Sequence, residues 1–460
     1  MKRRKVASSI FLIGVLVGTI SLLSFFWFRK VGREPSCPDC NIILIVIDPL
    51  RVDALPVYGN PRTETPTLDA LANRGVVFTN AFAVSSWTLP SAMSLMAGVY
   101  PSVHKITNKE LIPAEPSHTL TPANLAKAAP GIQTLASQLK ANGYVTGGFA
   151  GGAALDPSYG FSQGFDEYVS DGSFEGLPTT SPKAIDFISR HRSEKMFVFI
   201  HGFDVHGQYE PVGGYDRRYV QPTYKGKLTG STTEQKALRE EGVLGGRIYF
   251  SDADASYLRS LYDEKVSRID VYLKKIIDEI ALQNIAHKTI ILVTSDHGDE
   301  FYEHGRVDHG MTLFDEVLRI PLILTVPGMS DMTRIRGQVR NIDIIPTLLA
   351  LIGHAPSGSF TQQLQGVNLL PLMSGKDMKL DLFAETQYRY ATFQKAIRSW
   401  DGWKLVYDEE SQMKQLYLLT EDPKETTDLF ETGEKRESEL LEQLMRFINN
   451  ASDKSQRAKE

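Results

Sequence analysis

Two uninterrupted runs of β-branched and aliphatic residues constrain this chain more than any other feature. Residues 41–47 read NIILIVI and lead into Asp48, and residues 288–294 read KTIILVT and lead into Ser295 and Asp296. A strand without polar alternation is buried on both faces, which is typical of a parallel sheet covered by helices. The sequence therefore predicts such a sheet, with acidic residues where two of its strands end.

The segments between these runs alternate between helix-like and strand-like patterns. This alternation predicts an α/β fold with a doubly wound, mostly parallel sheet, whose ligand sites lie beyond the carboxyl ends of the strands. The regions 102–130 and 207–251 read as surface connections, and residues 394–419 read as short strands of a small antiparallel sheet. Helices are expected at 66–74, 91–97, 132–142, 183–192, 258–280 and 435–448, and further strands at 76–84, 144–150 and 196–201.

The N-terminus predicts a membrane anchor. Basic residues at 2–5 precede an apolar stretch over 6–28, which is long enough to cross a bilayer as a helix. No small-residue cleavage motif follows, so an uncleaved transmembrane helix is favoured over a cleaved signal peptide. The basic start places the N-terminus in the cytoplasm and the remaining chain outside it, periplasmic or extracellular, although Arg29, Lys30 and Arg33 weaken this bias.

The net charge and the cysteine content narrow the possible classes of protein further. The formal net charge of −5 gives no basic field that would attract nucleic acid. Cys37 and Cys40 are the only cysteines, and in an exported chain they are expected to form a local disulfide or to remain idle thiols. The predicted organisation is an anchor at 1–30, a linker at 31–40, a catalytic domain at 41–375, a C-terminal subdomain at 376–450 and a disordered tail at 451–460.

Acidic and histidine residues gather after the predicted strands. Asp48 follows the first strand, Asp296 and His297 follow a later one, and His201 and His206 follow a third. Each alone could be a helix cap or a satisfied core residue. Together at one sheet edge, oxygen and imidazole ligands suit one divalent cation, whether Ca, Mg, Mn or Zn.

Thr88 is the candidate nucleophile. It precedes Pro90 and an apolar helix, and the positive end of a helix dipole favours an alkoxide and an anionic substrate. The alternative interpretation makes Thr88 an ordinary N-cap.

Several ordered blocks resemble the sulfatase family of the alkaline phosphatase superfamily. They are Asp48 to Asp53, TPTLDALA (65–72), TLPS to GVYP (88–101), HGFDVHGQYEP (201–211), TSDHGDEFYEHGRVDHG (294–310) and LYLLTEDPKETTDL (416–429). The resemblance implies that Asp48, Asp296 and His297 hold the metal and that Thr88 is both ligand and nucleophile. It also implies that His206 contacts the substrate or leaving group, and that His309 stands where relatives carry a basic residue facing the substrate.

The chain departs from typical sulfatases in ways that bear on its reaction. Those enzymes convert Cys or Ser in C-x-P-S-R to formylglycine, but this chain has Thr88-Leu-Pro-Ser-Ala92. Threonine cannot give that aldehyde because its β-carbon bears a methyl group, so no formylglycine is expected. Pro49 replaces a second aspartate ligand, and His297 replaces an asparagine. Threonine nucleophiles and Asp-His ligands are features of superfamily members that act on phosphate esters.

The expected function is therefore metal-dependent hydrolysis of a phosphodiester or phosphomonoester on a small-molecule, lipid or glycan substrate. The alternatives are sulfuric ester hydrolysis and phosphoethanolamine-type transfer to envelope lipid or glycan, while an inactive binding module is disfavoured by the retained ligand set. One metal is preferred to two, with Asp204, His206 and His309 as candidates for a second site. His201 is expected either to be structural or to take part directly in the site, and His304 is expected to support the site. Trp87 and Tyr209 are expected to line the pocket. Arg51 is expected either to support the metal-binding carboxylates or to face solvent.

Overall fold

The computed structural model describes residues 34–457 apart from short gaps at 109–126, 171, 173, 208, 211–213, 215–216, 246–249, 357, 390–391 and 433–434. The predicted anchor at 1–30 lies outside the described residues and stays a prediction. Within the described part of the chain, no helix is both long enough and apolar enough to cross a bilayer. A disulfide joins Cys37 to Cys40, which is one of the two outcomes expected for this pair.

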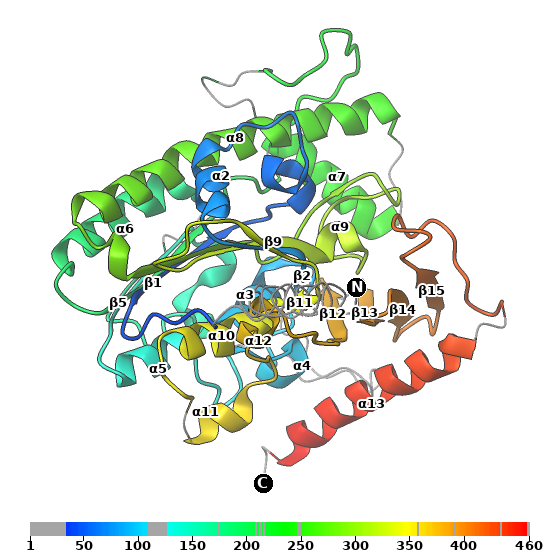
Figure 1. The fold of residues 1–460 in the computed structure, drawn as a ribbon. Helices are drawn as coiled ribbons and strands as arrows, with labels where there is room; N and C mark the ends of the chain where they lie inside the picture. Colours follow the sequence, from blue (N-terminus) through cyan, green and yellow to red (C-terminus); the bar gives the residue numbers. More distant parts are fainter. Residues whose placement is uncertain are drawn as a thin grey trace, which may run out of the picture.

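A nine-stranded sheet forms the centre of the molecule, with strand order β10-β2-β9-β6-β1-β5-β3-β4 and β11 paired to β2 (Figure 1). Every pairing is parallel except those of β9, which runs antiparallel to β2 and β6. The mostly parallel sheet is thus confirmed, with one reversed strand that the sequence did not reveal. The strands are β1 (Asn41–Ile47), β2 (Val76–Phe82), β3 (Val145–Ala150), β4 (Glu167–Ser170), β5 (Met196–Gly202), β6 (Thr289–Thr294), β9 (Arg319–Thr325), β10 (Thr333–Ile335) and β11 (Val339–Arg340).

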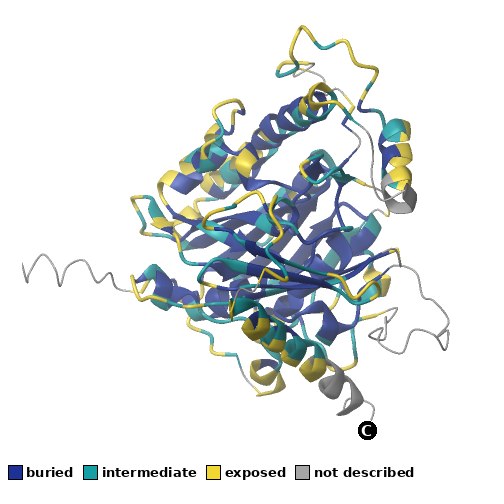
Figure 2. Ribbon diagram, turned by 90° about the vertical axis from the view of Figure 1, so that its right-hand side faces the viewer, coloured by how far each residue is buried: buried dark blue, intermediate teal, exposed yellow. Residues whose placement is uncertain are grey.

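Helices cover both faces of this sheet, and Figure 2 shows its strands buried between them. All seven residues of β1 are buried, and they divide by alternation between two cores. Ile42, Leu44 and Val46 pack into the core that contains Met93. Ile43, Ile45 and Ile47 pack into the other core. One face carries α2 (Pro66–Asn73), α6 (Leu177–Arg190) and α8 (Asp252–Leu282), and the other carries α3 (Thr88–Ala97), α4 (Pro101–His104), α5 (Leu135–Ala141), α10 (Ile344–Leu351), α11 (Gly358–Gln363) and α12 (Leu370–Met373).

Three helices begin earlier than the sequence pattern predicts, among them α8, which begins at Asp252 instead of at residue 258. Helix α3 begins at Thr88 instead of at residue 91, and α6 begins at Leu177 instead of at 183, with Pro182 inside it. Pro178 also stands in the first turn of α6, where a proline costs no hydrogen bond. The expected surface excursion at 207–251 contains α7 (Thr232–Gly245). Several helices outside the predicted ranges were missed, of which α7 is the longest.

The predicted C-terminal antiparallel sheet is confirmed. It consists of β12 (Leu382–Tyr388), β13 (Thr392–Arg398), β14 (Trp403–Asp408) and β15 (Lys414–Leu418), in sequence order. Helix α13 (Lys435–Arg457) packs on this sheet through Leu440 and Leu444. Between β6 and β9 in the chain lie the hairpin of β7 (Glu300–Phe301) and β8 (Val307–Asp308) and the short helix α9 (Asp315–Leu318).

A buried lysine ties the two sheets together. Lys404 on β14 is fully buried, and its Nζ lies 2.9 Å from Asp315 Oδ1 and 2.6 Å from Glu425 Oε1. Burial would raise the pKa of the Asp315 carboxyl, but Arg398 and Lys404 lower it to about 2. The C-terminal sheet is therefore attached to the catalytic domain through a charged contact in which Lys404 and Glu425 are buried and the Asp315 side chain is 17% exposed.

Replacing this lysine tests the contact. Lys404→Met should lower the free energy of unfolding by about 3–5 kcal/mol, because it removes the buried cation of Glu425 and leaves Asp315 with Arg398 alone. The matched control is Lys274→Met, which removes an exposed (i, i+4) pair with Asp278 and should cost only about 0.3–0.5 kcal/mol. Urea unfolding measures both, and equal losses in the two variants would show that the Lys404 contact is not specially important.

Candidate active site

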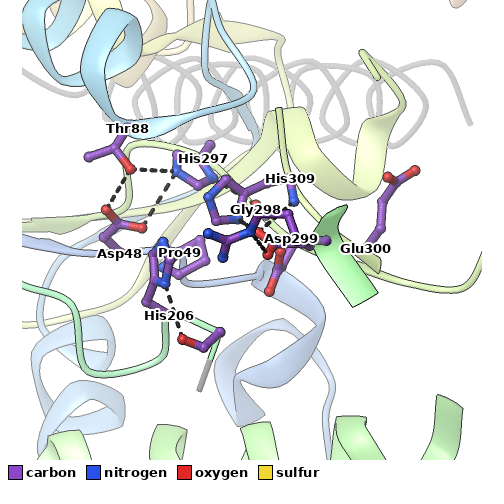
Figure 3. A network of polar contacts seen from close by, with 12 residues as sticks. Asp48, Pro49, Thr88, His206, His297, Gly298, Asp299, Glu300 and His309 are labelled. Carbon is purple, nitrogen blue, oxygen red and sulfur yellow. Dashed lines mark hydrogen bonds and ion pairs between the residues drawn. The ribbon is translucent and has the colours of Figure 1, made fainter. Parts of the chain in front are cut away.

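Four side chains meet at the carboxyl edge of the central sheet, and Figure 3 shows Asp48, Thr88 and His297 among them. Asp48 follows β1, Asp296 and His297 follow β6, and Thr88 is the first residue of α3. The parallel register places Val46 opposite Thr294, so the loops that follow β1 and β6 start side by side. All four side chains are buried, with 4% of Thr88 exposed and none of the other three. The structure thus brings together every residue that the sequence suggested for the metal and the nucleophile.

The Thr88 hydroxyl is directed at the strand ends and does not cap its helix. Trp87 is the N-cap residue of α3, and no side chain caps this end. Thr88 Oγ1 instead donates a hydrogen bond to Asp48 Oδ2 at 3.0 Å and lies 3.3 Å from His297 Nε2. The alternative interpretation of Thr88 as an ordinary N-cap is therefore wrong.

The tautomer of His297 follows from its neighbour. Nδ1 lies 2.8 Å from the carbonyl oxygen of Gly298 and donates to it. Burial lowers the pKa of His297 to about 3, and the nearby His309 adds to this effect, so the ring is neutral. Its Nε2 therefore presents a lone pair, 3.5 Å from Asp48 Oδ1 and 3.7 Å from Asp296 Oδ2.

The two carboxyl groups have opposite pKa shifts. Burial raises the pKa of Asp296 well above its ordinary range, and the charge of Asp48 raises it further. Burial opposes ionisation of Asp48 as well, but His297 and His201 lower its pKa below the usual value. Two buried carboxyl groups beside each other thus share a site that lacks positive charge of its own.

These groups fit a divalent cation. Asp48 Oδ1 and Asp296 Oδ2 are buried and have no hydrogen-bond partner in the described structure. Unpartnered buried oxygens are costly unless an ion or water satisfies them. Two carboxylate oxygens, an imidazole lone pair and a hydroxyl oxygen converge here, and this is a donor set that divalent metals accept.

His309 is held as a cation beside this cluster. Its Nδ1 lies 3.0 Å from Asp299 Oδ1 and 2.9 Å from Asp308 Oδ1. Burial would lower the pKa of His309, but Asp308 and Asp299 outweigh burial and raise it well above the ordinary value. The carboxylates are themselves fixed, since Arg239 of α7 pairs with Asp308 and the Tyr209 hydroxyl donates to Asp299.

His206 lies against His309, with ring centroids 4.9 Å apart. Its Nδ1 is 3.2 Å from the carbonyl oxygen of Gly207 and donates to it. Burial lowers the pKa of His206 to about 3, and the charge of His309 contributes. His206 is therefore a neutral ring, whereas His309 is the proton donor of the pair.

Two serines position the cluster, and the sequence analysis assigned neither of them a role. Ser295 Oγ accepts from the backbone N–H of Leu50 and lies 2.7 Å from the carbonyl oxygens of Ile47 and His297, so it ties the β1 loop to the β6 loop. Ser91 Oγ donates to the carbonyl oxygen of Asp296 at 2.5 Å, which fixes the first turn of α3. Ser295 stands inside the TSDHG block, and that position was the only available signal.

Several secondary expectations are corrected by the structure. Asp204, a candidate for a second metal site, instead accepts from the backbone N–H of Leu177 at 2.8 Å at the start of α6. Tyr209 packs on Tyr262 and Phe301 and supports Asp299, so it does not line the pocket. Arg51 is 6% exposed and pairs with Glu303 and with the carbonyl oxygen of Asp299. It therefore supports the loop after β6 and does not face solvent.

Comparison with known proteins identifies the family. Residues 40–354 match the family model described as Sulfatase. The chain belongs to the sulfatase family. Residues 302–454 also match the model described as N-sulphoglucosamine sulphohydrolase, C-terminal. This sulfatase-family hydrolase is thus covered by family matches from β1 to α13.

Individual relatives are distant. The ulvan-active sulfatase of Formosa agariphila is 25% identical over 370 residues, which cover 78% of this chain and 62% of that relative. Among solved structures, the phosphonate monoester hydrolase of Agrobacterium radiobacter has a TM-score of 0.70 at 19% identity, covering 90% of this chain and 96% of that one. BT4656, solved with its substrate D-glucosamine-2-N,6-O-disulfate, has a TM-score of 0.69 at 18% identity, with coverages of 92% and 99%. At these identities the structural likeness establishes the fold.

His304 does not join the catalytic cluster of this sulfatase-family chain. Its Nδ1 lies 2.5 Å from Glu316 Oε1, its Nε2 lies 3.1 Å from the carbonyl oxygen of Lys424, and its ring stacks on Phe314 at 3.5 Å. Burial lowers the pKa of His304, but the hydrogen bond to Glu316 outweighs burial and raises it to about 9. Both ring nitrogens donate, so the imidazolium joins the β7–β8 region to the C-terminal segment.

This assignment predicts a pH-dependent contribution to stability. Because the pKa of His304 is higher in the folded than in the unfolded state, protonated His304 stabilises the fold fully below about pH 6.5. This contribution disappears as the pH rises through about 9. His304→Gln should therefore lower the midpoint of thermal unfolding clearly at pH 6 and little at pH 10. The exposed His287→Gln serves as control for replacing a histidine. A loss for His304→Gln of the same size at both pH values would contradict the charged state.

Proposed function

We propose that this sulfatase-family hydrolase cleaves phosphate-type esters, with Thr88 as nucleophile and one divalent ion held by Asp48, Thr88, Asp296 and His297. The observation that carries the proposal is the Thr88 hydroxyl, which donates to Asp48 Oδ2 at 3.0 Å and stands 3.3 Å from a neutral His297 Nε2. A side chain with a methyl group on its β-carbon cannot become formylglycine, so the hydroxyl itself must attack.

The ion would supply positive charge that favours ionisation of the hydroxyl and stabilises charge on the phosphoryl group. Thr88 adds two features of its own. It stands in the first turn of α3, whose dipole favours an anion at this end. Its helix is held to the Asp296 backbone by Ser91, so the oxygen does not need to be repositioned before attack.

The chemical steps then use groups that are already in place. Thr88 Oγ1 forms a bond to phosphorus while the bond from phosphorus to the leaving oxygen breaks. The Thr88 proton passes to Asp48 Oδ2, and His309 gives the proton on Nε2 to the leaving oxygen. In the second step a water oxygen bonds to phosphorus, its proton goes to His309 Nε2, and Thr88 regains its own proton as its bond to phosphorus breaks.

His309 also compensates for a charge missing from α3. Ala92, which is 1% exposed, stands where typical family members carry an arginine. A cation held between Asp299 and Asp308 provides the positive charge from a different loop. His206 packs on this ring and presents a neutral nitrogen toward the substrate side.

A hydrolysis panel tests the proposed reaction. The full-length chain would be assayed with p-nitrophenyl phosphate, bis-p-nitrophenyl phosphate, a phenylphosphonate ester and p-nitrophenyl sulfate, each with Mg, Ca, Mn or Zn. Metal-dependent cleavage of a phosphate-type ester should fall by at least about 10³-fold in Thr88→Ala, because the nucleophile is lost. Thr88→Ser, which keeps the hydroxyl, should retain most of the activity.

The remaining outcomes discriminate among the alternatives. Cleavage of the sulfate ester alone would overturn the proposal in favour of sulfuric ester hydrolysis, which is the second candidate because many relatives are named sulfatases. Metal binding without cleavage of any ester would move the assignment to a transferase that needs a lipid or glycan acceptor. Unchanged phosphate-ester cleavage in Thr88→Ala would exclude Thr88 as nucleophile.

We also propose that the catalytic domain is exported through the N-terminal segment. The Cys37–Cys40 disulfide supports this, since disulfides persist in oxidising compartments. A C-terminal fusion to a reporter enzyme that folds only outside the cytoplasm should be active in cells. The same fusion without residues 1–30 should be inactive, and equal activity of the two would contradict export by this segment.

A further inference from the structure

His201 is a buried histidine that the proposed ligand set does not use. It stands in β5, opposite Val46 of β1, one residue before the point where β5 ends. The side chain is fully buried, and its ring packs against Phe203 with centroids 4.7 Å apart. Its Nε2 lies 3.6 Å from Asp48 Oδ2, so the ring is directed toward the cluster of carboxyl groups.

Neither ring nitrogen of His201 has a hydrogen-bond partner within the described structure. Leaving a buried donor or acceptor unsatisfied costs about 1–3 kcal/mol, so a purely structural histidine normally has a partner. Asp48 Oδ1 and Asp296 Oδ2 are also buried and have no hydrogen-bond partner in the described structure. One ligand atom from each of Asp48, His201 and Asp296 lies within 4.8 Å of the others.

Two other clusters have the composition of a metal site but lack this property. His309 shares its Nδ1 between Asp299 and Asp308, whose carboxylates are engaged by Tyr209 and Arg239. His304 donates to Glu316 and to a backbone carbonyl. In the first cluster a protonated histidine satisfies both carboxylates, and in the second His304 pairs with Glu316 while the Thr312 hydroxyl donates to Glu300. The group with Asp48, His201 and Asp296 is the one whose buried oxygens and nitrogen remain unmatched.

We infer that His201 is a further protein ligand of the same divalent ion, and this inference rests on the metal site of the proposed function. Pro49 follows Asp48 and carries no ligand atom, and His201 approaches the same carboxylate from the neighbouring strand. His297 approaches Asp48 Oδ1 and His201 approaches Asp48 Oδ2, so two imidazoles flank one carboxylate. The ion is therefore held by two imidazole nitrogens as well as by oxygens.

This ligand set changes the expected metal. Calcium, magnesium and manganese prefer sites made of oxygen, whereas imidazole nitrogens favour zinc, copper, iron and nickel. Two imidazoles in one site thus predict that Zn binds more tightly than Ca or Mg. Removal of His201 should reduce this preference, because the remaining set has a single nitrogen.

Pulsed EPR of the full-length chain loaded with Mn(II) tests the inference, because it detects imidazole nitrogens bound directly to the ion. The wild type should show one Mn(II) per chain with two coordinated nitrogens. His201→Phe, which keeps a ring against Phe203, should show one nitrogen and bind Mn(II) at least about 10-fold more weakly by calorimetry. The matched control His206→Phe replaces another ring that contacts Phe203 and should leave two nitrogens.

Each outcome has a defined meaning. A single nitrogen in the wild type, unchanged in His201→Phe, would overturn the role of His201 while leaving the proposed function intact. Two Mn(II) ions per chain would overturn the assignment of His201 to the same ion. No Mn(II) or Zn(II) binding by the wild type would overturn the metal site itself and the inference with it. His201→Leu, which is smaller, replaces His201→Phe if the larger ring prevents folding, and the wild-type nitrogen count stands without any variant.

Discussion

The parallel pairing of β1 with β5 and β6 is the constraint on which the site depends. Val46 stands opposite His201 on one side and Thr294 on the other, so three strands end at the same level. This parallel register places Asp48, His201 and Asp296 next to one another. The hydrophobic core on both faces holds this register, and the Ser295 hydroxyl then fixes how the β1 and β6 loops leave the sheet.

The site concentrates negative groups and then compensates for them unequally. Asp299 and Asp308 are both paired with the protonated ring of His309. In addition, Tyr209 donates a hydrogen bond to Asp299, and Arg239 forms an ion pair with Asp308. Asp48 receives a hydrogen bond from Thr88 and Asp296 a long one from Ser295, and both carboxyl groups face the neutral Nε2 of His297. A buried pair of carboxyl groups with so little compensation is unfavourable in an isolated protein, and it is favourable where a cation is to be bound.

Much of this arrangement was readable from the sequence. Asp48, Asp296 and His297 were predictable because acidic residues that follow buried runs must meet at the edge of a parallel sheet. Thr88 was predictable only through the resemblance to a family, since local pattern alone also permits a helix cap. His309 was found in the same way, but Asp299 and Asp308, which set its charge, come together only through the β7–β8 hairpin. No periodic pattern specifies that contact.

Other failures have equally specific causes. The start of α6 was misplaced because Pro182 reads as a boundary, although tertiary packing overrides this propensity. His201 could not be assigned from sequence, because a histidine at the end of a strand has no signature that separates core from ligand. His304 lies in the same block, residues 294–310, as His309, yet it forms a hydrogen bond with Glu316 and contacts the C-terminal segment. The outcome for each histidine was decided by carboxylates distant in the chain.

The buried amine of Lys404 makes the C-terminal sheet inseparable from the catalytic sheet. A chain ending before β12 would retain Asp315 at the start of α9 without either Lys404 or Arg398 beside it. The segment that looks like an appendage in the sequence is therefore part of one cooperative unit. If this segment were exchanged between relatives, Asp315 would have to be exchanged together with Lys404 and Arg398.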